Sequence, residues 1–207
     1  MLQFITHSSD RLSIPEQVRL AIEGGCRWIQ LRMKDATDAE VAEMAREIIP
    51  ICRDNETILV IDDRVDVVME TKVHGVHLGK NDMEPAKARE FLGPHAIIGC
   101  TANTSDEILA LARLDIDYIG LGPFRFTTTK EKLAPTLGLE GYRRIVSEVR
   151  AAGCELPIVA IGGITSDDVP ALLETGVNGI AMSGAIINAS DPAATVRSIL
   201  DEGGRKN

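Results

Sequence analysis

Two segments decide the fold, Pro157-Ile-Val-Ala-Ile-Gly-Gly163 and Gly179-Ile-Ala-Met-Ser-Gly184, each a short apolar run that ends in small or polar residues. Runs of this length and composition are typical of buried strands. The stretch between them, Asp167–Glu174, has helical spacing and is followed by Gly176. A strand, a helix and a second strand in this order predict a parallel βαβ unit.

The same unit recurs along the whole chain. The other apolar runs are Leu2–Thr6, Trp28–Arg32, Ile58–Asp62, Gly75–Gly79, Ile97–Thr101 and Tyr118–Gly122. Helical stretches are expected at Ala39–Cys52, Glu84–Leu92, Asp106–Leu114, Glu140–Arg150 and Asp191–Leu200. Eight such units predict an α/β fold, a (β/α)8 TIM barrel in a single domain over residues 1–207. The alternative is an open doubly wound sheet, which eight similar units would make unusually broad.

The composition limits the kinds of partner. Hydrophobic residues make up 44% of the chain and aromatic ones only 3%, so we expect an aliphatic core. A net charge of −9 without Lys/Arg blocks argues against nucleic-acid binding. No signal peptide is evident, and no apolar run reaches the roughly 18–20 residues of a membrane helix. The scattered Cys26, Cys52, Cys100 and Cys154 predict reduced thiols in a cytoplasmic protein, and a homo-oligomer is compatible with the sequence.

In a TIM barrel the active site lies at the C-terminal ends of the strands, and polar residues follow most of the apolar runs. Gln30, Arg32 and Lys34 alternate, so on an extended strand they would share one side. A cation at the barrel interior is costly unless it is paired. A bound anion would provide that pairing, and so would the carboxylates of Asp62, Asp63 or Asp82.

Two acids follow neighbouring strands of the predicted barrel. Asp63 comes at the end of the third apolar run and Asp82 follows the fourth. Two facing carboxylates repel each other, and together with substrate phosphate and water they form a typical Mg2+ site. The alternative for Asp82 is a helix cap on Glu84–Leu92.

Three later segments carry groups that bind anions. Thr127-Thr-Thr129-Lys130 follows the sixth run with three hydroxyls and a lysine, although such a loop is also compatible with a solubilising role. Gly162-Gly163 follows the seventh run, and Ser183 follows the eighth. Loops after strands seven and eight form the phosphate site of many TIM barrels. The mouth is therefore expected to hold a metal and two separate anion sites.

In order and spacing these motifs resemble the thiamine-phosphate synthase (thiamine-phosphate pyrophosphorylase) family across nearly the whole chain. Gln30–Lys34 resembles its Q-L-R-x-K, Asp62–Asp66 its N-D-R-x-D, Gly75–Asp82 its G-V-H-L-G-x-x-D and Thr127–Lys130 its T-x-T-K, with Gly162-Gly163-Ile164 and Ser183 completing the set. Asp62 stands where the family usually has Asn. An ionised Asp cannot donate a hydrogen bond, so Asp62 is expected to pair with Arg32 or approach the metal. Thr101 stands where the family often has Ser and keeps the hydroxyl.

The resemblance implies a transferase that couples a hydroxymethylpyrimidine diphosphate with a thiazole phosphate, or its carboxylated form, and releases pyrophosphate. The implied diphosphate ligands are Gln30, Arg32, Lys34 and Lys130, with Mg2+ on Asp63 and Asp82. The implied ligands of the thiazole phosphate are Thr127, Thr129, Gly163, Met182 and Ser183, and Asp62 and Thr101 are further substrate contacts. Arg32, Lys34 and Lys130, with Mg2+, are expected to stabilise the departing pyrophosphate in a dissociative step. A thiazole tautomerase and a non-catalytic barrel that binds a phosphorylated metabolite remain the alternatives.

Overall fold

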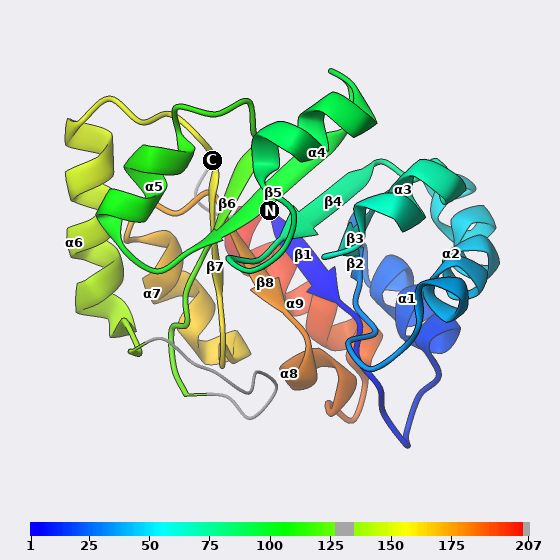
Figure 1. Cartoon of the computed structure of the whole chain (residues 1–207). Helices are drawn as coiled ribbons and strands as arrows, with labels where there is room; N and C mark the ends of the chain where they lie inside the picture. The colour runs from blue at the N-terminus through cyan, green and yellow to red at the C-terminus, as the bar shows by residue number, and fades with distance from the viewer. Residues whose placement is uncertain (127–134, 205–207) are drawn as a thin grey trace.

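Eight parallel strands close into a barrel in the computed structural model, which describes residues 1–126 and 135–204 (Figure 1). The strands are β1 (Leu2–Ile5), β2 (Trp28–Leu31), β3 (Ile58–Asp62), β4 (Gly75–Leu78), β5 (Ile97–Ala102), β6 (Tyr118–Leu121), β7 (Ile158–Ile161) and β8 (Gly179–Met182). Each strand pairs with the next in sequence, and β1 also pairs with β8 through Phe4 and Met182. The predicted TIM barrel is confirmed, and the open sheet is wrong because no edge remains between β1 and β8.

Helices follow the strands and surround the barrel (Figure 1). They are α1 (Ile14–Glu23), α2 (Asp38–Arg53), α3 (Val65–Thr71), α4 (Pro85–Leu92), α5 (Ser105–Leu111), α6 (Gly138–Ala151), the 3-10 turn η1 (Ser166–Asp168), α7 (Val169–Leu173), α8 (Gly184–Ile187) and α9 (Pro192–Gly204). Helix α2 shows why the starts are well defined. Thr37 accepts a hydrogen bond from Glu40 N, and the Glu40 side chain accepts one from Thr37 N. Two backbone N–H groups at the start of the helix thus gain hydrogen-bond partners.

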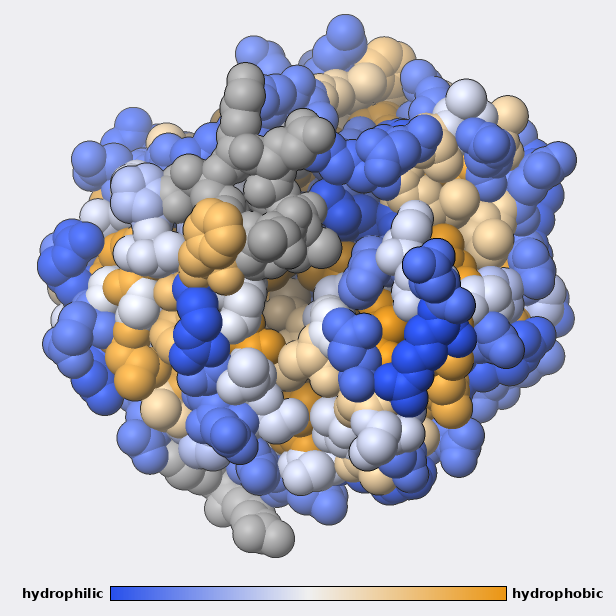
Figure 2. All heavy atoms as spheres, turned by 90° about the horizontal axis from the view of Figure 1, so that it is seen from below, coloured by the Kyte–Doolittle hydropathy of each residue, from blue (hydrophilic) through white to orange (hydrophobic). Residues whose placement is uncertain are grey.

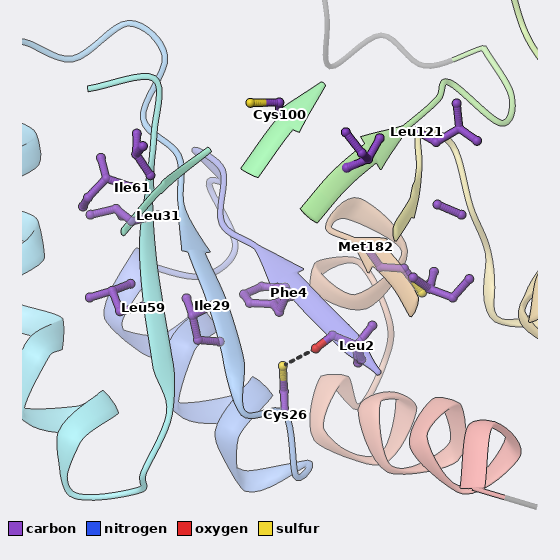
Figure 3. Close-up of a cluster of buried hydrophobic side chains, with 14 of the residues drawn as sticks. Leu2, Phe4, Cys26, Ile29, Leu31, Leu59, Ile61, Cys100, Leu121 and Met182 are labelled. Atoms are coloured by element: carbon purple, nitrogen blue, oxygen red, sulfur yellow. Dashed lines mark hydrogen bonds between the residues drawn. The ribbon is translucent and has the colours of Figure 1, made fainter. Parts of the chain in front are cut away.

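The outer core lies between the barrel and its helices, and strand alternation builds it. Successive residues of a strand point to opposite faces, so Leu2 and Phe4 of β1 enter this outer layer while Ile5 faces the barrel interior. Figure 3 shows residues of four strands in this layer, namely Leu2, Phe4, Ile29, Leu31, Leu59, Ile61 and Met182. The core consists mainly of Ile, Val, Leu and Ala, as the low aromatic content of the composition predicts.

The barrel interior has a small apolar cluster of its own, made of Ile5, Trp28, Tyr118, Val159 and Ala181. The Trp28 and Tyr118 rings meet edge to face with their centroids 4.7 Å apart. Because two large rings fill the interior where β2 and β6 begin, polar side chains are left to occupy the ends of the strands.

The remaining sequence expectations concern membranes and cysteines. None of the helices in the described part of the chain is both long and apolar enough to cross a membrane. Cys26, Cys52, Cys100 and Cys154 are all free and buried. Burial raises the pKa of Cys52 and of Cys100 to about 12, so these thiols stay protonated and unreactive near neutral pH.

Candidate functional site

The C-terminal ends of the strands form one face of the molecule, toward the bottom of Figure 1, where α8 follows β8. Figure 2 looks onto this face from below and shows hydrophilic residues around a paler, partly hydrophobic centre. Most of the residues singled out in the sequence follow a strand on this face. Their positions can therefore be compared directly with the expected metal site and the two anion sites.

Asp63 and Asp82 meet above Gly79. A Cβ atom at Gly79 would stand 2.8 Å from Asp82 Oδ2 and 3.9 Å from Asp63 Oδ1, so both carboxyl groups border this one glycine. Gly79 N donates to Asp82 Oδ2 at 2.6 Å, and Asp63 N donates to the carbonyl oxygen of His77 at 2.8 Å. The backbone of β4 and its following turn thus holds both acids together.

The carboxyl group of Asp63 is held under electrostatic stress. Burial, then the charge of Asp62, then the hydrogen bond and charge of Asp82 raise the pKa of Asp63 to about 8. The residue also has φ of 66°, a left-handed conformation that a non-glycine side chain rarely adopts. Strain and crowded negative charge are both tolerated at this position, and both are typical of functional sites.

The donor set at this point fits a hard divalent cation. A hollow beside the two acids is lined by Asp63, Arg64, Asn81 and Asp82 among others, so the oxygen ligands that Mg2+ prefers are within the same small space. Within residues 1–126 and 135–204 no three His, Cys, Asp or Glu side chains group closely enough to hold a metal by themselves. Mg2+ commonly takes one or two carboxylates and completes its shell with substrate phosphate and water, which two acids allow.

The helix-cap alternative for Asp82 is wrong. Glu84 occupies the N-cap position of α4, and no side chain caps that helix by a hydrogen bond within the described structure. Asp82 instead accepts from Gly79, in the turn that leads out of β4. The side chain of Asp82 is exposed and remains beside Asp63.

Arg32 pairs with Asp62 across β2 and β3. Arg32 Nε lies 3.2 Å from Asp62 Oδ2, so the expected pairing of these two residues is confirmed. Arg32 N donates to Thr6 Oγ1 at 3.0 Å, which fixes the backbone where β2 ends. The guanidinium is partly exposed at the mouth.

Gln30 and Lys34 do not share the extended arrangement that their spacing suggested. Strand β2 ends at Leu31 and Lys34 lies in a turn, so the expectation of one continuous extended run is wrong. Arg64 holds this turn, because Arg64 Nη2 donates to the carbonyl oxygen of Ala36 at 2.6 Å. Gln30 is 2% exposed, and its side chain interacts with the Tyr118 hydroxyl, but its Nε2 makes no hydrogen bond of standard geometry among the described residues. A buried donor without a full hydrogen bond is costly, so a ligand acceptor would complete its bonding here.

A chain of polar side chains crosses the barrel below the mouth. Gln3 Nε2 donates to Tyr118 Oη at 3.1 Å, Tyr118 Oη lies 2.9 Å from His77 Nδ1, and His77 Nε2 lies 3.0 Å from Thr101 Oγ1. Thr101, a predicted substrate contact, is thus oriented by His77. Since both ring nitrogens of His77 are engaged, this histidine supports the site rather than serving as a free base.

The ends of β7 and β8 hold the other predicted anion ligands. Gly162 and Gly163 have φ of 100° and 67°, and a Cβ atom would stand 2.7 Å from Pro123 Cβ at the first and 3.0 Å from the Phe126 carbonyl oxygen at the second, so both positions favour glycine. Ser183 Oγ donates to the carbonyl oxygen of Ile5 at 2.5 Å, which ties β8 to β1. Met182 is 3% exposed and belongs to the outer core, so its side chain points away from the mouth and only its backbone is in reach of a ligand.

Thr127, Thr129 and Lys130 lie outside the described residues. Two further residues at the mouth were not assigned from the sequence. His7 contacts Ser183, and Arg125 contacts both Gly163 and Asp168. His7 follows the first apolar run directly and Arg125 lies within the segment after the sixth, and position at a strand end was the only signal that could have identified them.

Comparisons with known proteins identify the family and the fold. A family model described as thiamine monophosphate synthase matches residues 2–186. A thiamine-phosphate synthase of Bacteroides thetaiotaomicron is 55% identical over 200 residues, covering 97% of this chain and 96% of that protein. The structure of thiamine phosphate pyrophosphorylase from Pyrococcus furiosus is 34% identical with a TM-score of 0.85, covering 97% of this chain and 94% of that one. A 3-hexulose-6-phosphate synthase structure, with 16% identity, a TM-score of 0.70 and coverage of 96% and 98%, shares the fold alone.

Proposed function

The chain belongs to the thiamine monophosphate synthase family, and on this premise we propose that it couples a hydroxymethylpyrimidine diphosphate to a thiazole phosphate, or its carboxylated form, with Mg2+. Family membership makes the chain a transferase. The observation that carries the proposal is that the carboxyl groups of Asp63 and Asp82 lie together above Gly79. They form an oxygen-rich site for a cation, beside the partly buried Arg64.

In this reaction the protein has to stabilise a departing pyrophosphate, and no nucleophilic side chain is required. The bond between the pyrimidine methylene carbon and the diphosphate oxygen breaks, and an electron-rich aminopyrimidine stabilises the resulting cation. The thiazole nitrogen then forms the new bond to that carbon. In this proposal Arg32, Lys34 and Lys130 stabilise the negative charge that develops on pyrophosphate. Mg2+, held by Asp63 and Asp82, would supply further neutralisation of the diphosphate when bound.

Gln30 supports the pyrimidine half of the proposal. Its buried Nε2 makes no hydrogen bond of standard geometry among the described residues, although the side chain interacts with the Tyr118 hydroxyl, and a heteroaromatic nitrogen of the pyrimidine would provide a better acceptor. The Thr101 hydroxyl is oriented by His77, and we assign it as a second polar contact. Binding a neutral ring between such groups favours specificity for a hydrogen-bonding heterocycle over a plain aromatic ring.

The thiazole phosphate is assigned to the ends of β7 and β8. Gly163 stands in the turn after β7, and Ser183 follows Met182 at the end of the adjacent strand β8. Thr127 and Thr129 are proposed as further ligands of this substrate.

We also propose that residues 1–207 form one cytoplasmic domain. Closure of β1 on β8 and the four free, buried cysteines support this view.

A pyrophosphate-release assay with both substrates and Mg2+ tests the function. We expect release that requires all three components, and Asp63→Ala should lower it by about 100-fold or more while the fold survives. Asp54→Ala is a matched control, because Asp54 is an exposed acid at the end of α2, away from the barrel mouth. Release by Asp63→Ala at the parent rate would defeat the metal assignment. Thiazole phosphate binding without any pyrophosphate release would indicate a non-catalytic barrel or a tautomerase.

A further inference from the structure

Arg125 and Asp168 form a two-pronged ion pair between the segment after β6 and the segment after β7. Arg125 Nη1 lies 2.6 Å from Asp168 Oδ2, and Arg125 Nη2 lies 2.8 Å from Asp168 Oδ1. The planar guanidinium also lies over the Phe124 ring, with Cζ 4.7 Å from the ring centroid. A bidentate pair with a stacked guanidinium has one preferred orientation, so it fixes geometry as well as adding attraction.

The same arginine holds two successive carbonyl groups of the glycine turn. Arg125 N donates to the carbonyl oxygen of Gly162 at 2.9 Å, and Arg125 Nη1 donates to that of Gly163 at 2.9 Å. In a trans peptide the C=O and the following N–H point in opposite directions. The N–H groups of Gly163 and Ile164 are therefore directed away from the donors of Arg125 that hold the two carbonyl groups.

These two N–H groups are not used by the described protein. No hydrogen bond from Gly163 N or Ile164 N to a residue within 1–126 or 135–204 exists in the structure. A Cβ atom at Gly163 would stand 3.0 Å from the Phe126 carbonyl oxygen and 3.1 Å from Arg125 Cβ, so the turn lies tightly against the β6 segment. Two successive backbone donors without a partner among the described residues are suited to an anion.

Asp168 fixes the far end of the turn. Its Oδ2 accepts from Thr165 N at 2.8 Å and from Thr165 Oγ1 at 2.8 Å, in addition to the bonds from Arg125. The hydrogen bonds from Arg125 are the main cause that lowers the pKa of Asp168 to about 2, so the carboxylate is ionised at any physiological pH. Arg125 therefore holds the start of the turn, at Gly162 and Gly163, and Asp168 holds its end, at Thr165.

We propose that Arg125 and Asp168 are positioning residues for the thiazole phosphate, because they orient the Gly163 and Ile164 N–H groups toward it. Neither residue is expected to touch the substrate. The inference rests on the proposed function for the identity of the substrate, but its core, an anion-binding turn oriented by an ion pair, can be tested without catalysis.

A purely structural ion pair would behave differently. Arg125 is about half exposed, and ion pairs of this kind add little to stability. Loss of the pair should therefore leave the thermal midpoint nearly unchanged. It should weaken binding at the turn, since two backbone donors would no longer be held in place.

The experiment compares Arg125→Met with the parent enzyme in steady-state kinetics and in calorimetric titration with thiazole phosphate and with inorganic phosphate. We expect KM for the thiazole phosphate and Kd for both anions to rise by about tenfold, with kcat and KM for the pyrimidine diphosphate changed less than about twofold. Arg125→Lys keeps the charge and one donor, and it should restore part of the affinity. Arg125→Met/Asp168→Asn should be little worse than the single variants, because both remove one interaction.

Arg144→Met is the matched control, since Arg144 forms an exposed pair with Glu148 on α6 and has no contact with the turn. It should leave KM, Kd and the thermal midpoint unchanged. Equal losses for both substrates, a lowered thermal midpoint with normal anion affinity, or a fully active Arg125→Met enzyme would each overturn the proposal. If no pyrophosphate is released by the parent protein, the calorimetric comparison still decides whether the ion pair orients an anion site. If Arg125→Met does not fold, Arg125→Lys and Asp168→Asn provide the same comparison.

Discussion

His7 Nδ1 lies 2.7 Å from Ser183 Oγ, and this contact joins the ends of the first and last strands at the barrel mouth. Ser183 Oγ also lies 2.5 Å from the carbonyl oxygen of Ile5, which can only accept. The single hydroxyl hydrogen therefore points to Ile5, so His7 must donate from Nδ1. A neutral His7 then has its hydrogen on Nδ1 and a bare Nε2.

We predict that His7 titrates below its ordinary range. Burial, followed by the positive charge of Arg32, lowers the pKa of His7 from 6.5. The unfolded chain then binds the proton at higher pH than the folded one, so stability is full above about pH 6.5 and falls as pH drops through the folded pKa. An NMR titration of the His7 ring should give a midpoint below 6.5. His7→Asn, which keeps a side-chain donor, should reduce the loss of stability in acid, and a midpoint at or above 6.5 would contradict the assignment.

The barrel and the acid pair could be predicted because both depend on local patterns. Eight apolar runs of strand length, each followed by polar residues, leave few ways to bury every strand. Asp63 and Asp82 follow consecutive strands of a parallel sheet, so topology alone brings them to one rim. Arg32 and Asp62 also end neighbouring strands, and their pairing could be anticipated for the same reason.

The features that could not be predicted depend on contacts between residues far apart in the sequence, or on helices too short to show a period. The partner of Arg125 is Asp168, and no spacing rule connects two residues so far apart in the sequence. Helix α3 has 7 residues, too few to show a clear period. Helix α1 was not singled out, although Ser13 and Glu16 form the start signal S-x-x-E, with Ser13 N donating to the Glu16 carboxylate at 2.8 Å.

We predict that the metal-free protein loses stability as pH rises toward 8. The pKa of Asp63 is raised from 3.8 to about 8, so across this window the folded state holds a proton that the unfolded state has released. The slope for one proton cannot exceed about 1.4 kcal/mol per pH unit, and solvent screening at a partly exposed carboxyl group makes it smaller. Urea unfolding across this range should show the decline, and Asp63→Asn should remove it.

Added Mg2+ provides the control for that prediction. Metal binding requires the ionised carboxylate, so Mg2+ should stabilise the parent protein more at pH 8.5 than at pH 5. Asp63→Asn should lose most of this stabilisation. A parent protein whose stability is flat between pH 4 and pH 8, or rises across that range, would show that Asp63 does not carry the raised pKa.

We predict that Asp62→Asn improves binding of the pyrimidine diphosphate. If Arg32 binds the diphosphate as proposed, Asp62 competes with it, since Asp62 Oδ2 lies 3.2 Å from Arg32 Nε. An amide at position 62 would release the guanidinium and could itself donate to a phosphate oxygen. KM for the diphosphate should fall by a few fold, and the pKa of Asp63 should decrease because a neighbouring charge is lost.

Asp62→Ala separates the two contributions to that prediction. It removes the competing charge without adding a donor, so its KM for the diphosphate should lie between those of the parent and Asp62→Asn. A rise in KM for both variants would mean that Asp62 orients Arg32 productively, and the competition argument would be wrong.

We predict that Gly99→Ala destabilises the barrel from inside. A Cβ atom at Gly99 would stand 2.0 Å from Tyr118 Cζ, and the ring cannot retreat because it meets Trp28 edge to face. Overpacking of a filled core costs about 1–3 kcal/mol, measurable as a lower urea midpoint. Gly203→Ala is the control, since its Cβ would meet only Leu173 Cδ1 at 3.8 Å and alanine favours helix by about 0.5–1 kcal/mol. If the Gly99 variant is as stable as the parent, the interior is less tightly packed than these contacts require.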